Sequence, residues 1–323
     1  MSVSPLHLPW GAEALWQSLV PVLPGVSVEV VSRLESTNTR LLERARASGG
    51  NPEAPVTRPG ELDSLGRTER TPHGRRAGDI SPCLLVAEEQ TRGRGRLGRD
   101  WVSSAGASLT FSLSLPLAPA HWGGLSLAVG LALAEALDPW PPGEALDDGS
   151  TQAGGSASGL RIALKWPNDL WLAEGPGRGR KLGGILIETV TVGQRRMCVV
   201  GVGLNVLPQP AVPAASGVLA HGYACLQELD PEASAPRALA RVALPLVQSL
   251  RRFETEGFAP LVAAYSQRDL LRGQRVTTTA PEALEGLAEG VDEQGALRLV
   301  TQEDGQELHR IVSGEVSVRL GGA

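Results

Sequence analysis

A short stretch rich in arginine and glycine, TRGRGRLGRDW at residues 91–101, has the chemistry to bind an anion. Arginine is always charged and presents a fixed fork of donors to carboxylates and phosphates. Glycine lets the backbone adopt a positive φ or approach a ligand closely. The stretch therefore predicts a loop that closes around an anion. Its arginines and glycines are Arg92, Gly93, Arg94, Gly95, Arg96, Gly98 and Arg99.

Two common phosphate-binding motifs match part of this loop but fail on their context. Gly93-x-Gly95-x-x-Gly98 has the dinucleotide spacing, but that fingerprint opens a helix and requires an acidic residue about 20 positions later. Here residues 108–115 alternate like a strand, and no acidic residue lies between Asp100 and Glu135. A Walker A loop requires Lys-Ser/Thr where this chain has Arg99-Asp100. A solvated basic loop without function is the remaining simple alternative.

Polar side chains at the start of an expected helix form a second candidate site. Residues 40–45 have a helical composition, and Ser36 or Thr37 would cap the helix at its start. A plain helix cap is one interpretation of this pattern. In the other, exposed hydroxyls and the amides of the first turn face a carbonyl or carboxylate of a ligand.

Two further polar motifs adjoin expected strands. Residues 161–165 predict a strand that runs into the turn Trp166-Pro167-Asn168-Asp169. This turn is either purely structural or places Lys165, Asn168 and Asp169 beside a nucleotide and its metal. Lys181 precedes two glycines and an expected strand at 185–192. Its ammonium can therefore reach into a cleft whose wall is bare backbone.

Composition limits the class of protein. The chain has 323 residues, a formal net charge of −5 and a pI near 5.7, which argues against a general nucleic-acid binder. Cys83, Cys198 and Cys225 are widely separated, and Cys83 and Cys198 lie in apolar runs that predict buried thiols, which fits a reducing cytoplasm. The N-terminal residues lack the pattern of a signal peptide. The longest apolar stretch, 125–137, is too short to span a membrane.

The expected elements predict an α+β protein with two domains. A short extension, 1–26, has room for one helix and not for a helix-turn-helix, and a large domain follows at 27–271. Beyond residue 272, five short alternating segments separated by turn signals predict a small β domain at 272–323. Residues 48–80 and 139–159 are rich in glycine and proline and are expected to be surface insertions without an assigned function.

Together, five motifs in this order resemble those of the biotin protein ligases. The resemblance covers most of residues 27–320. It implies a catalytic domain like that of class II aminoacyl-tRNA synthetases, with a mostly antiparallel mixed sheet and helices, followed by an SH3-like barrel. The implied reaction forms biotinyl-5′-adenylate from biotin and ATP and then transfers biotin to a carrier-protein lysine. The motifs are ESTN (35–38), EEQTRGRGRLGRDW (88–101), KWPNDL (165–170), KLGGILIE (181–188) and GVGLNV (201–206).

The resemblance also implies which residues form the site. Arg94, Arg96 and Lys181 would be catalytic, because they would neutralise a carboxylate and a triphosphate that repel each other. Leu97 stands where many relatives carry arginine, which predicts weaker retention of the adenylate. The implied biotin contacts are Ser36, Thr37, Asn38, Gln90, Arg94, Gly95, Arg96, Lys181 and Gly184. The implied nucleotide contacts are Arg96, Arg99, Trp101, Asn168 and Asn205, with Asp169 on Mg²⁺.

Two alternative functions remain open from the sequence. One is a lipoate or octanoate ligase of the same superfamily, and the other is a non-catalytic protein that binds biotin as a signal. The expected partner is the biotin carboxyl carrier domain of a biotin-dependent carboxylase, in the cytoplasm and without DNA or membrane. An exposed strand beside the site would suit carrier docking or a homodimer.

Overall fold

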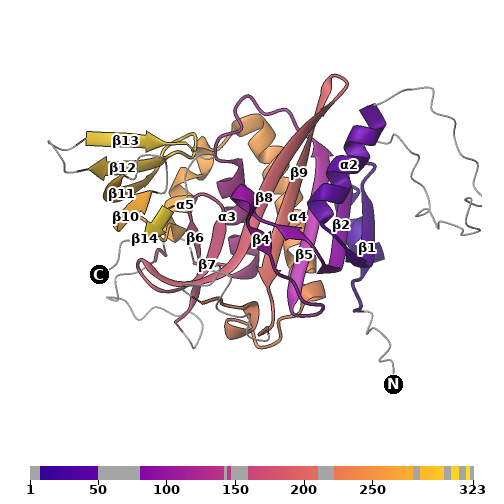
Figure 1. Cartoon of the computed structure of the whole chain (residues 1–323), viewed down its shortest axis with the longest axis horizontal. Helices are drawn as coiled ribbons and strands as arrows, with labels where there is room; N and C mark the ends of the chain where they lie inside the picture. The colour runs from indigo at the N-terminus through magenta and orange to yellow at the C-terminus, as the bar shows by residue number, and fades with distance from the viewer. Residues whose placement is uncertain are drawn as a thin grey trace, which may run out of the picture.

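The computed structural model contains two β-sheets, and helices pack mainly against the larger one (Figure 1). The larger sheet has seven strands in the order β1-β2-β5-β9-β8-β7-β6, and the smaller has five in the order β13-β12-β11-β10-β14. The residues that the structure describes are 8–49, 81–141, 144–146, 159–209, 222–278, 284–301, 307–312 and 318–320. The expected insertion at 48–80 lies almost entirely outside these residues.

The larger sheet is mixed and mostly antiparallel, as expected. β1 and β2 run parallel and are connected through a helix, whereas the other neighbouring pairs are antiparallel. One expectation is wrong: Lys181 lies inside β8 and not ahead of it, because β7 continues the pairing and puts Trp171 opposite Lys181. The strands are β1 (Ser27–Leu34), β2 (Cys83–Gln90), β5 (Ser108–Pro116), β6 (Arg161–Lys165), β7 (Asp169–Gly175), β8 (Arg178–Val192) and β9 (Arg195–Asn205).

Helices cover both faces of this sheet. On β2, Leu84 and Val86 belong to the large core that also contains the apolar side chains of α1, α3 and α4. Cys83 and Leu85, which alternate with them, pack instead with Leu41 and other residues of α2 on the opposite face. A strand covered on both sides reads as a continuous apolar run, which β2 does. The helices are α1 (Ala12–Leu19), α2 (Thr37–Gly49), α3 (Leu125–Leu137), α4 (Ala235–Glu256) and α5 (Val262–Arg268).

The smaller sheet confirms the expectation of about five short strands near the C-terminus. Its β11–β12 turn contacts the start of α3 through bare backbone, since a Cβ at Gly295 would lie 2.4 Å from Gly124 Cα. Trp166, which precedes the Pro167-Asn168-Asp169 bend, donates its indole N–H to the Gly295 carbonyl at 3.0 Å. The strands are β10 (Arg275–Thr278), β11 (Glu285–Val291), β12 (Leu297–Thr301), β13 (Glu307–Ile311) and β14 (Val318–Leu320).

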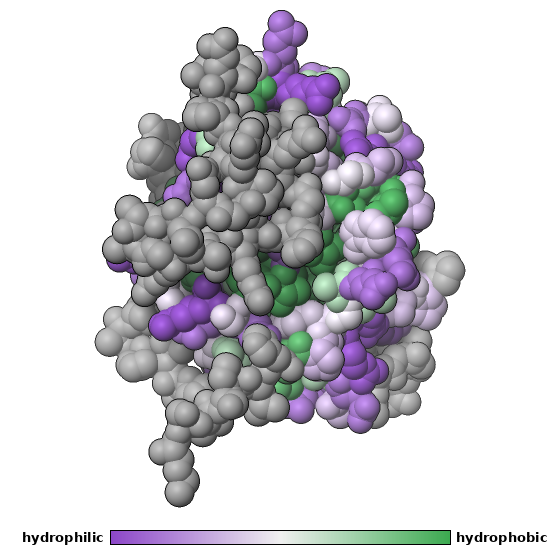
Figure 2. Space-filling view, turned by 90° about the vertical axis from the view of Figure 1, so that its right-hand side faces the viewer, coloured by the Kyte–Doolittle hydropathy of each residue, from purple (hydrophilic) through white to green (hydrophobic). Residues whose placement is uncertain are grey.

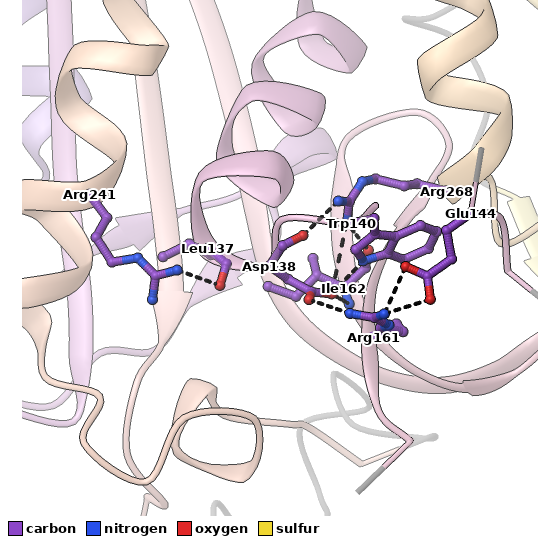
Figure 3. A network of polar contacts seen from close by, with 8 residues as sticks. All are labelled: Leu137, Asp138, Trp140, Glu144, Arg161, Ile162, Arg241 and Arg268. Carbon is purple, nitrogen blue, oxygen red and sulfur yellow. Dashed lines mark hydrogen bonds and ion pairs between the residues drawn. The ribbon is translucent and has the colours of Figure 1, made fainter. Parts of the chain in front are cut away.

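A buried polar network, here called the α3 clasp, closes the C-terminal end of α3 (Figure 3). Asp138 accepts hydrogen bonds from the Trp140 indole at 2.7 Å, the Ile162 amide at 2.8 Å and Arg161 at 3.0 Å. Arg268 lies 4.0 Å from the centre of a Trp140 ring and donates to the Asp138 and Ile162 carbonyls at 2.6 and 3.1 Å. The clasp residues are Asp138, Trp140, Glu144, Arg161, Arg241 and Arg268.

The clasp satisfies carbonyls that a helix end leaves without partners inside the helix. Arg241 of α4 donates to the Leu137 carbonyl at 2.9 Å, and Arg161 donates to both carboxylate oxygens of Glu144 at 2.7 and 2.8 Å. Trp140 and Glu144 fall within 139–159, which we expected to be a surface insertion. At the described start of that segment, the half-buried Trp140 ring lies beside Arg161 and Arg268. Residues 147–158 lie outside the described residues, so the expectation stays a prediction.

Figure 2 shows the side of the molecule on which β1 and α2 lie, where hydrophobic surface is bordered by hydrophilic surface. β1 forms one end of the larger sheet's strand order, and Trp16 of α1, which packs near it, is 45% exposed. The three cysteines are free and buried, which confirms the expectation of buried thiols at Cys83 and Cys198. Among the helices that the structure describes, none is both long enough and apolar enough to cross a membrane.

Candidate active site

The start of α2 carries a buried cluster of hydroxyl and amide groups. Ser36 accepts the Thr39 amide at 3.4 Å and so caps the helix, as expected. The Thr37 amide and hydroxyl both donate to Oε1 of Gln90, at 2.7 and 3.1 Å. Ser36 and Thr37 are only 5% and 3% exposed, so the expectation of exposed hydroxyls is wrong. The first turn of α2 is covered because it packs into the sheet.

Asn38 connects this helix to two strands. Its amide Nδ2 donates to the Leu186 carbonyl at 3.1 Å and to Glu188 at 2.9 Å, and its Oδ1 accepts from Ser112 at 2.6 Å. A Cβ at Gly201 would lie 2.2 Å from Asn38 Oδ1, so only glycine on β9 leaves room for this side chain. Sequence reasoning did not select Ser112 or Glu188 as site residues.

The arginine-rich stretch forms a tight hairpin beside this cluster, made of β3 (Gly93–Arg94), the 3₁₀ turn Arg96–Gly98 and β4 (Asp100–Trp101). Leu97 and Gly98 have φ values of 56° and 71°, and the Gly95 amide donates to the Arg99 carbonyl at 2.7 Å. Arg94 donates through one nitrogen to both oxygens of Glu188, at 2.8 and 3.0 Å. The Arg99 side chain is exposed.

A second group of predicted residues meets at the bend after β6. Lys181 donates to Oδ1 of Asp169 at 2.7 Å, and Arg96 donates to Oδ1 of Asn168 at 3.3 Å. Burial lowers the pKa of the Arg96 guanidinium, and the charge of Asp169 opposes this effect. A Cβ at Gly184 would lie 3.5 Å from both Lys181 Nζ and Asp169 Oδ1, so this glycine borders the pair.

Lys165 is placed differently from its neighbours in the motif. Its ammonium lies 4.5 Å from the centre of a Trp171 ring, and Trp171 belongs to a small core cluster with Ala163 and Leu270. Asp169 forms an ion pair with Lys181. A role of Lys165 beside a nucleotide, which the turn motif allowed, stays a prediction.

Trp101, in strand β4 of the arginine hairpin, and Asn205, at the end of β9, belong to a third group of predicted residues. The Trp101 ring covers Gly203, where a Cβ would come within 2.4 Å of the indole, and its Nε1 is buried without a hydrogen-bond partner among the described residues. Asn205 is 7% exposed and accepts a hydrogen bond from Gln209 at 3.3 Å. Tyr223 fixes the position of Gln209, because the Tyr223 hydroxyl accepts a hydrogen bond from the Gln209 backbone N–H at 2.9 Å.

The structure thus joins the predicted residues into three adjacent groups along β8 and β9. The first group consists of the hydroxyl and amide side chains at the start of α2. In the second group, Arg94 and Lys181 each pair with one carboxylate. The third group is the Trp101 indole, which covers Gly203 of β9. Side chains of this kind can hold a small polar molecule, neutralise anions and cover a planar ring. Together, the three groups have the chemistry of an enzyme that binds a small anionic substrate.

Comparison with known proteins narrows this class. Residues 77–205 match the Biotin/lipoate A/B protein ligase family, and residues 272–319 match the Biotin protein ligase C terminal domain. The bifunctional ligase/repressor BirA of Escherichia coli is 31% identical over 301 residues, which are 92% of this chain and 75% of that protein. The biotin--[acetyl-CoA-carboxylase] ligase of Mycobacterium tuberculosis is 32% identical over 302 residues, 90% of this chain and 85% of that protein. The chain belongs to the biotin protein ligase family.

A solved structure agrees with this assignment at the level of the fold. The biotin protein ligase of Aquifex aeolicus, in complex with biotin and ATP, superposes with a TM-score of 0.62 at 24% sequence identity. The superposition covers 91% of this chain and 99% of that one. Both sheets of the present structure therefore belong to an arrangement already known in this family.

Proposed function

We propose that this chain is an ATP-dependent biotin protein ligase whose site residues act as the motifs imply. The observation that carries the proposal is the direct connection of the buried polar cluster at the start of α2 to a basic hairpin. Arg94 reaches that cluster through Glu188, at 2.8 Å, and Arg96 and Lys181 contact the neighbouring bend. A small polar acid bound at the cluster would present its carboxylate to cations.

Biotin would lie against the cluster, where paired amides and hydroxyls can match the donors and acceptors of its fused rings. The proposed biotin contacts of this cluster are Ser36, Thr37, Asn38 and Gln90. Gly95 and Gly184 would border the ligand with bare backbone, and Arg94, Arg96 and Lys181 would reach its carboxylate. Support comes from burial: Thr37 and Asn38 are each 3% exposed, so their polar atoms are fixed by neighbours before a ligand arrives.

The first chemical step would join the two anions. A biotin carboxylate oxygen attacks the α-phosphorus of ATP, the bond from that phosphorus to the β,γ-phosphates breaks, and pyrophosphate leaves. Arg94, Arg96 and Lys181 would neutralise the repulsion and stabilise the added charge of the transition state. Each preorganised donor of this kind is typically worth about 3 kcal/mol of the barrier.

The nucleotide would lie between Trp101 and the bend after β6. An indole that covers bare backbone offers a flat apolar surface to adenine, and its unpartnered buried N–H is a donor that a ligand can use. Asn168 and Asn205 would donate or accept hydrogen bonds to the nucleotide, and the exposed Arg99 would reach its phosphates.

Asp169 fits a Mg²⁺ ion that arrives with ATP. Magnesium in such sites is usually bound by one or two carboxylates plus substrate phosphates, and Asp169 supplies one carboxylate. The described residues hold no group of three metal-binding side chains, so the phosphates would supply most of the ligands. The ion would neutralise phosphate charge while Lys181 and Arg96 orient the carboxylate.

The second step would transfer biotin to a lysine of a biotin carboxyl carrier domain. The lysine amine attacks the acyl carbon of the adenylate, an amide forms, and AMP and a proton leave. β1 ends the larger sheet on one side, so its outer edge would suit carrier docking or a homodimer. The outer edge of β6 is less suited, because its Ile162 and Leu164 backbone groups are bonded to Asp138, Arg268 and Leu270. The likeness to class II aminoacyl-tRNA synthetases and to SH3-like barrels belongs to this proposal, supported by the mixed sheet and the small antiparallel sheet.

Pyrophosphate–ATP exchange with purified protein and Mg²⁺ tests the proposal. Biotin, lipoate and octanoate are added separately, and we expect exchange with biotin alone. Exchange with lipoate or octanoate would instead make the chain a ligase for those acids. No exchange from folded protein that still binds biotin would favour a non-catalytic binding protein.

A further inference from the structure

Glu188 on β8 contacts both the polar cluster and the arginine hairpin. Its Oε2 accepts from Asn38 at 2.9 Å and from Arg94 at 2.8 Å, and its Oε1 accepts from Arg94 at 3.0 Å. Asn38 and Arg94 are 150 and 94 residues away from Glu188 along the chain. One carboxylate is therefore shared by an amide from α2 and a guanidinium from β3.

The contact with Asn38 continues through the polar cluster. Ser112 lies 2.6 Å from both Asn38 Oδ1 and the Thr37 hydroxyl, and Thr37 donates to Gln90 at 3.1 Å. A row of close polar contacts thus runs from β2, through the cluster, to the guanidinium of the hairpin. Its six side chains are Gln90, Thr37, Ser112, Asn38, Glu188 and Arg94.

Folding stability does not account for a carboxylate in this position. The Arg94–Glu188 pair is partly exposed, at 44% and 27%, and ion pairs of this kind contribute little to stability. A carboxylate beside a pocket for anions also repels the ligand, unless a cation neutralises it. The negative charge of Glu188 alone therefore opposes the binding of an anionic substrate. Its function must lie in its effect on the position of Arg94.

We propose that Glu188 is a positioning residue that holds the Arg94 guanidinium over the pocket until a substrate anion replaces the carboxylate as its partner. A long arginine side chain loses considerable rotamer freedom when it is fixed, and a preformed contact meets that cost before the ligand binds. The path through Asn38 ties this contact to the surface on which biotin would lie. The inference rests on the proposed function, in which Arg94 binds the carboxylate of biotin.

Glu188→Gln separates the two contacts of the carboxylate. Glutamine still accepts from Asn38 through its amide oxygen but cannot form the ion pair with Arg94. We expect KM for biotin of the full-length variant to rise about fivefold, because Arg94 must then be ordered when the ligand binds, with kcat within about twofold of the wild type. Glu188→Ala loses both contacts, so it should raise KM for biotin further.

A double-mutant cycle with Arg94→Gln decides whether Glu188 acts through Arg94. If it does, Glu188→Gln raises KM for biotin in the wild type and has no further effect in the Arg94→Gln background. Independent, additive effects on KM for biotin would overturn the proposal. Glu89→Gln is the matched control, because Glu89 forms a partly exposed ion pair with Arg33 on the same sheet, and its KM for biotin should equal that of the wild type.

Trypsin cleavage of the ligand-free protein gives a result that does not depend on catalysis. Trypsin must bind the arginine side chain, so freeing Arg94 should increase cleavage after residue 94 several-fold in Glu188→Gln. Cleavage after Arg99, whose side chain is exposed in any case, is the internal control. Unchanged cleavage after Arg94 would contradict the positioning role. A wild-type protein that forms no adenylate would overturn the catalytic function and leave this result to decide the positioning role.

Discussion

The α3 clasp and the arginine hairpin use arginine and carboxylate side chains in opposite ways. In the clasp, the Arg268 and Asp138 side chains are 4% and 6% exposed, and several partners surround each. In the hairpin, Arg94 is 44% exposed and depends on one carboxylate. A charge buried in a complete network cannot exchange its partner without unfolding, whereas a partly exposed pair can. The comparison indicates which network stabilises the fold and which is available to a ligand.

The largest effect is expected from breaking the clasp. Asp138→Ala would leave the buried Arg268 guanidinium without its counter-charge, and burial already lowers the pKa of Arg268 to about 10 while Asp138 opposes that change. Removing one partner of a buried pair typically costs about 3–5 kcal/mol of unfolding free energy. Urea denaturation should show this loss, with KM for ATP unchanged in the protein that remains folded.

The control for the clasp is Glu232→Ala, since Glu232 forms an exposed pair with Arg237. Its effect on unfolding should stay below about 0.5 kcal/mol. Equal effects of the two variants would show that the clasp does not stabilise the protein.

Lys181→Ala should reduce catalysis strongly and change the free energy of unfolding only slightly, the reverse of the effects expected for Asp138→Ala. Lys181 is 36% exposed, so its loss should change unfolding by less than about 1 kcal/mol. If it stabilises the transition state, biotin-dependent pyrophosphate exchange should fall about 10²-fold, with a smaller change in ATP binding. Exchange at the wild-type rate would remove the charge role from Lys181. Arg252→Ala, in an exposed pair on α4, serves as the control.

Asp269 is a buried carboxylate that lacks the clasp's complete set of partners. Its Oδ2 has no hydrogen-bond partner among the described residues, and burial raises its pKa to about 7, although the Leu271 amide and Arg272 oppose this. Its neighbour Tyr265 is also buried, with a raised pKa. The folded state therefore holds the Asp269 proton more tightly than the unfolded state, and stability falls as the pH rises from about 4 to about 7.

Asp269→Asn tests this reading, because asparagine stays neutral at every pH. Thermal or urea unfolding should show the stability of the variant relative to the wild type rising by roughly 4 kcal/mol between pH 4 and pH values above 7. A constant difference across this range would mean that Asp269 does not titrate on unfolding.

The smallest effect is expected at Leu97, on the hairpin itself. Leu97 is 64% exposed with a positive φ, so Leu97→Arg adds a charge without displacing any packed group. A solvent-exposed cation near a bound phosphate should slow adenylate release about two- to fivefold at low salt and less at high salt. Release at an unchanged rate in low salt would exclude Leu97 as the cause of weaker retention.

The spacing of hydrophobic residues predicted helices and strands correctly where a single periodicity was clear. The alternation at 108–115 located β5, and the apolar run at 125–137 located α3. The start of β8 was missed, because residues 178–181 are polar and glycine-rich and are held extended only by pairing with β7. The contacts of Trp140 with Arg161 and Arg268 were not predicted, because they join residues that are distant along the chain and leave no local pattern.

The site was predicted through motifs and missed where long-range contacts matter. Ser112 belongs to a strand that reads as half exposed, yet its polar row is buried, and its partners lie 74 and 75 residues away. Glu188 closes the KLGGILIE motif, but only the structure brings it to Arg94. A charged residue at the end of an apolar strand motif was the available signal. The individual roles of the predicted residues stay predictions until the variants are measured.

The two lysines of the chain bear on self-modification. Lys165 and Lys181 are its only lysines, and the other 28 cationic side chains are arginines. An acyl-adenylate acylates free amines, whereas a guanidinium remains protonated and does not react at neutral pH. The Lys165 ammonium lies over the Trp171 ring, and Lys181 is bound to Asp169. The protein therefore offers its own activated biotin few acceptors, which favours the lysine that a docked partner brings in.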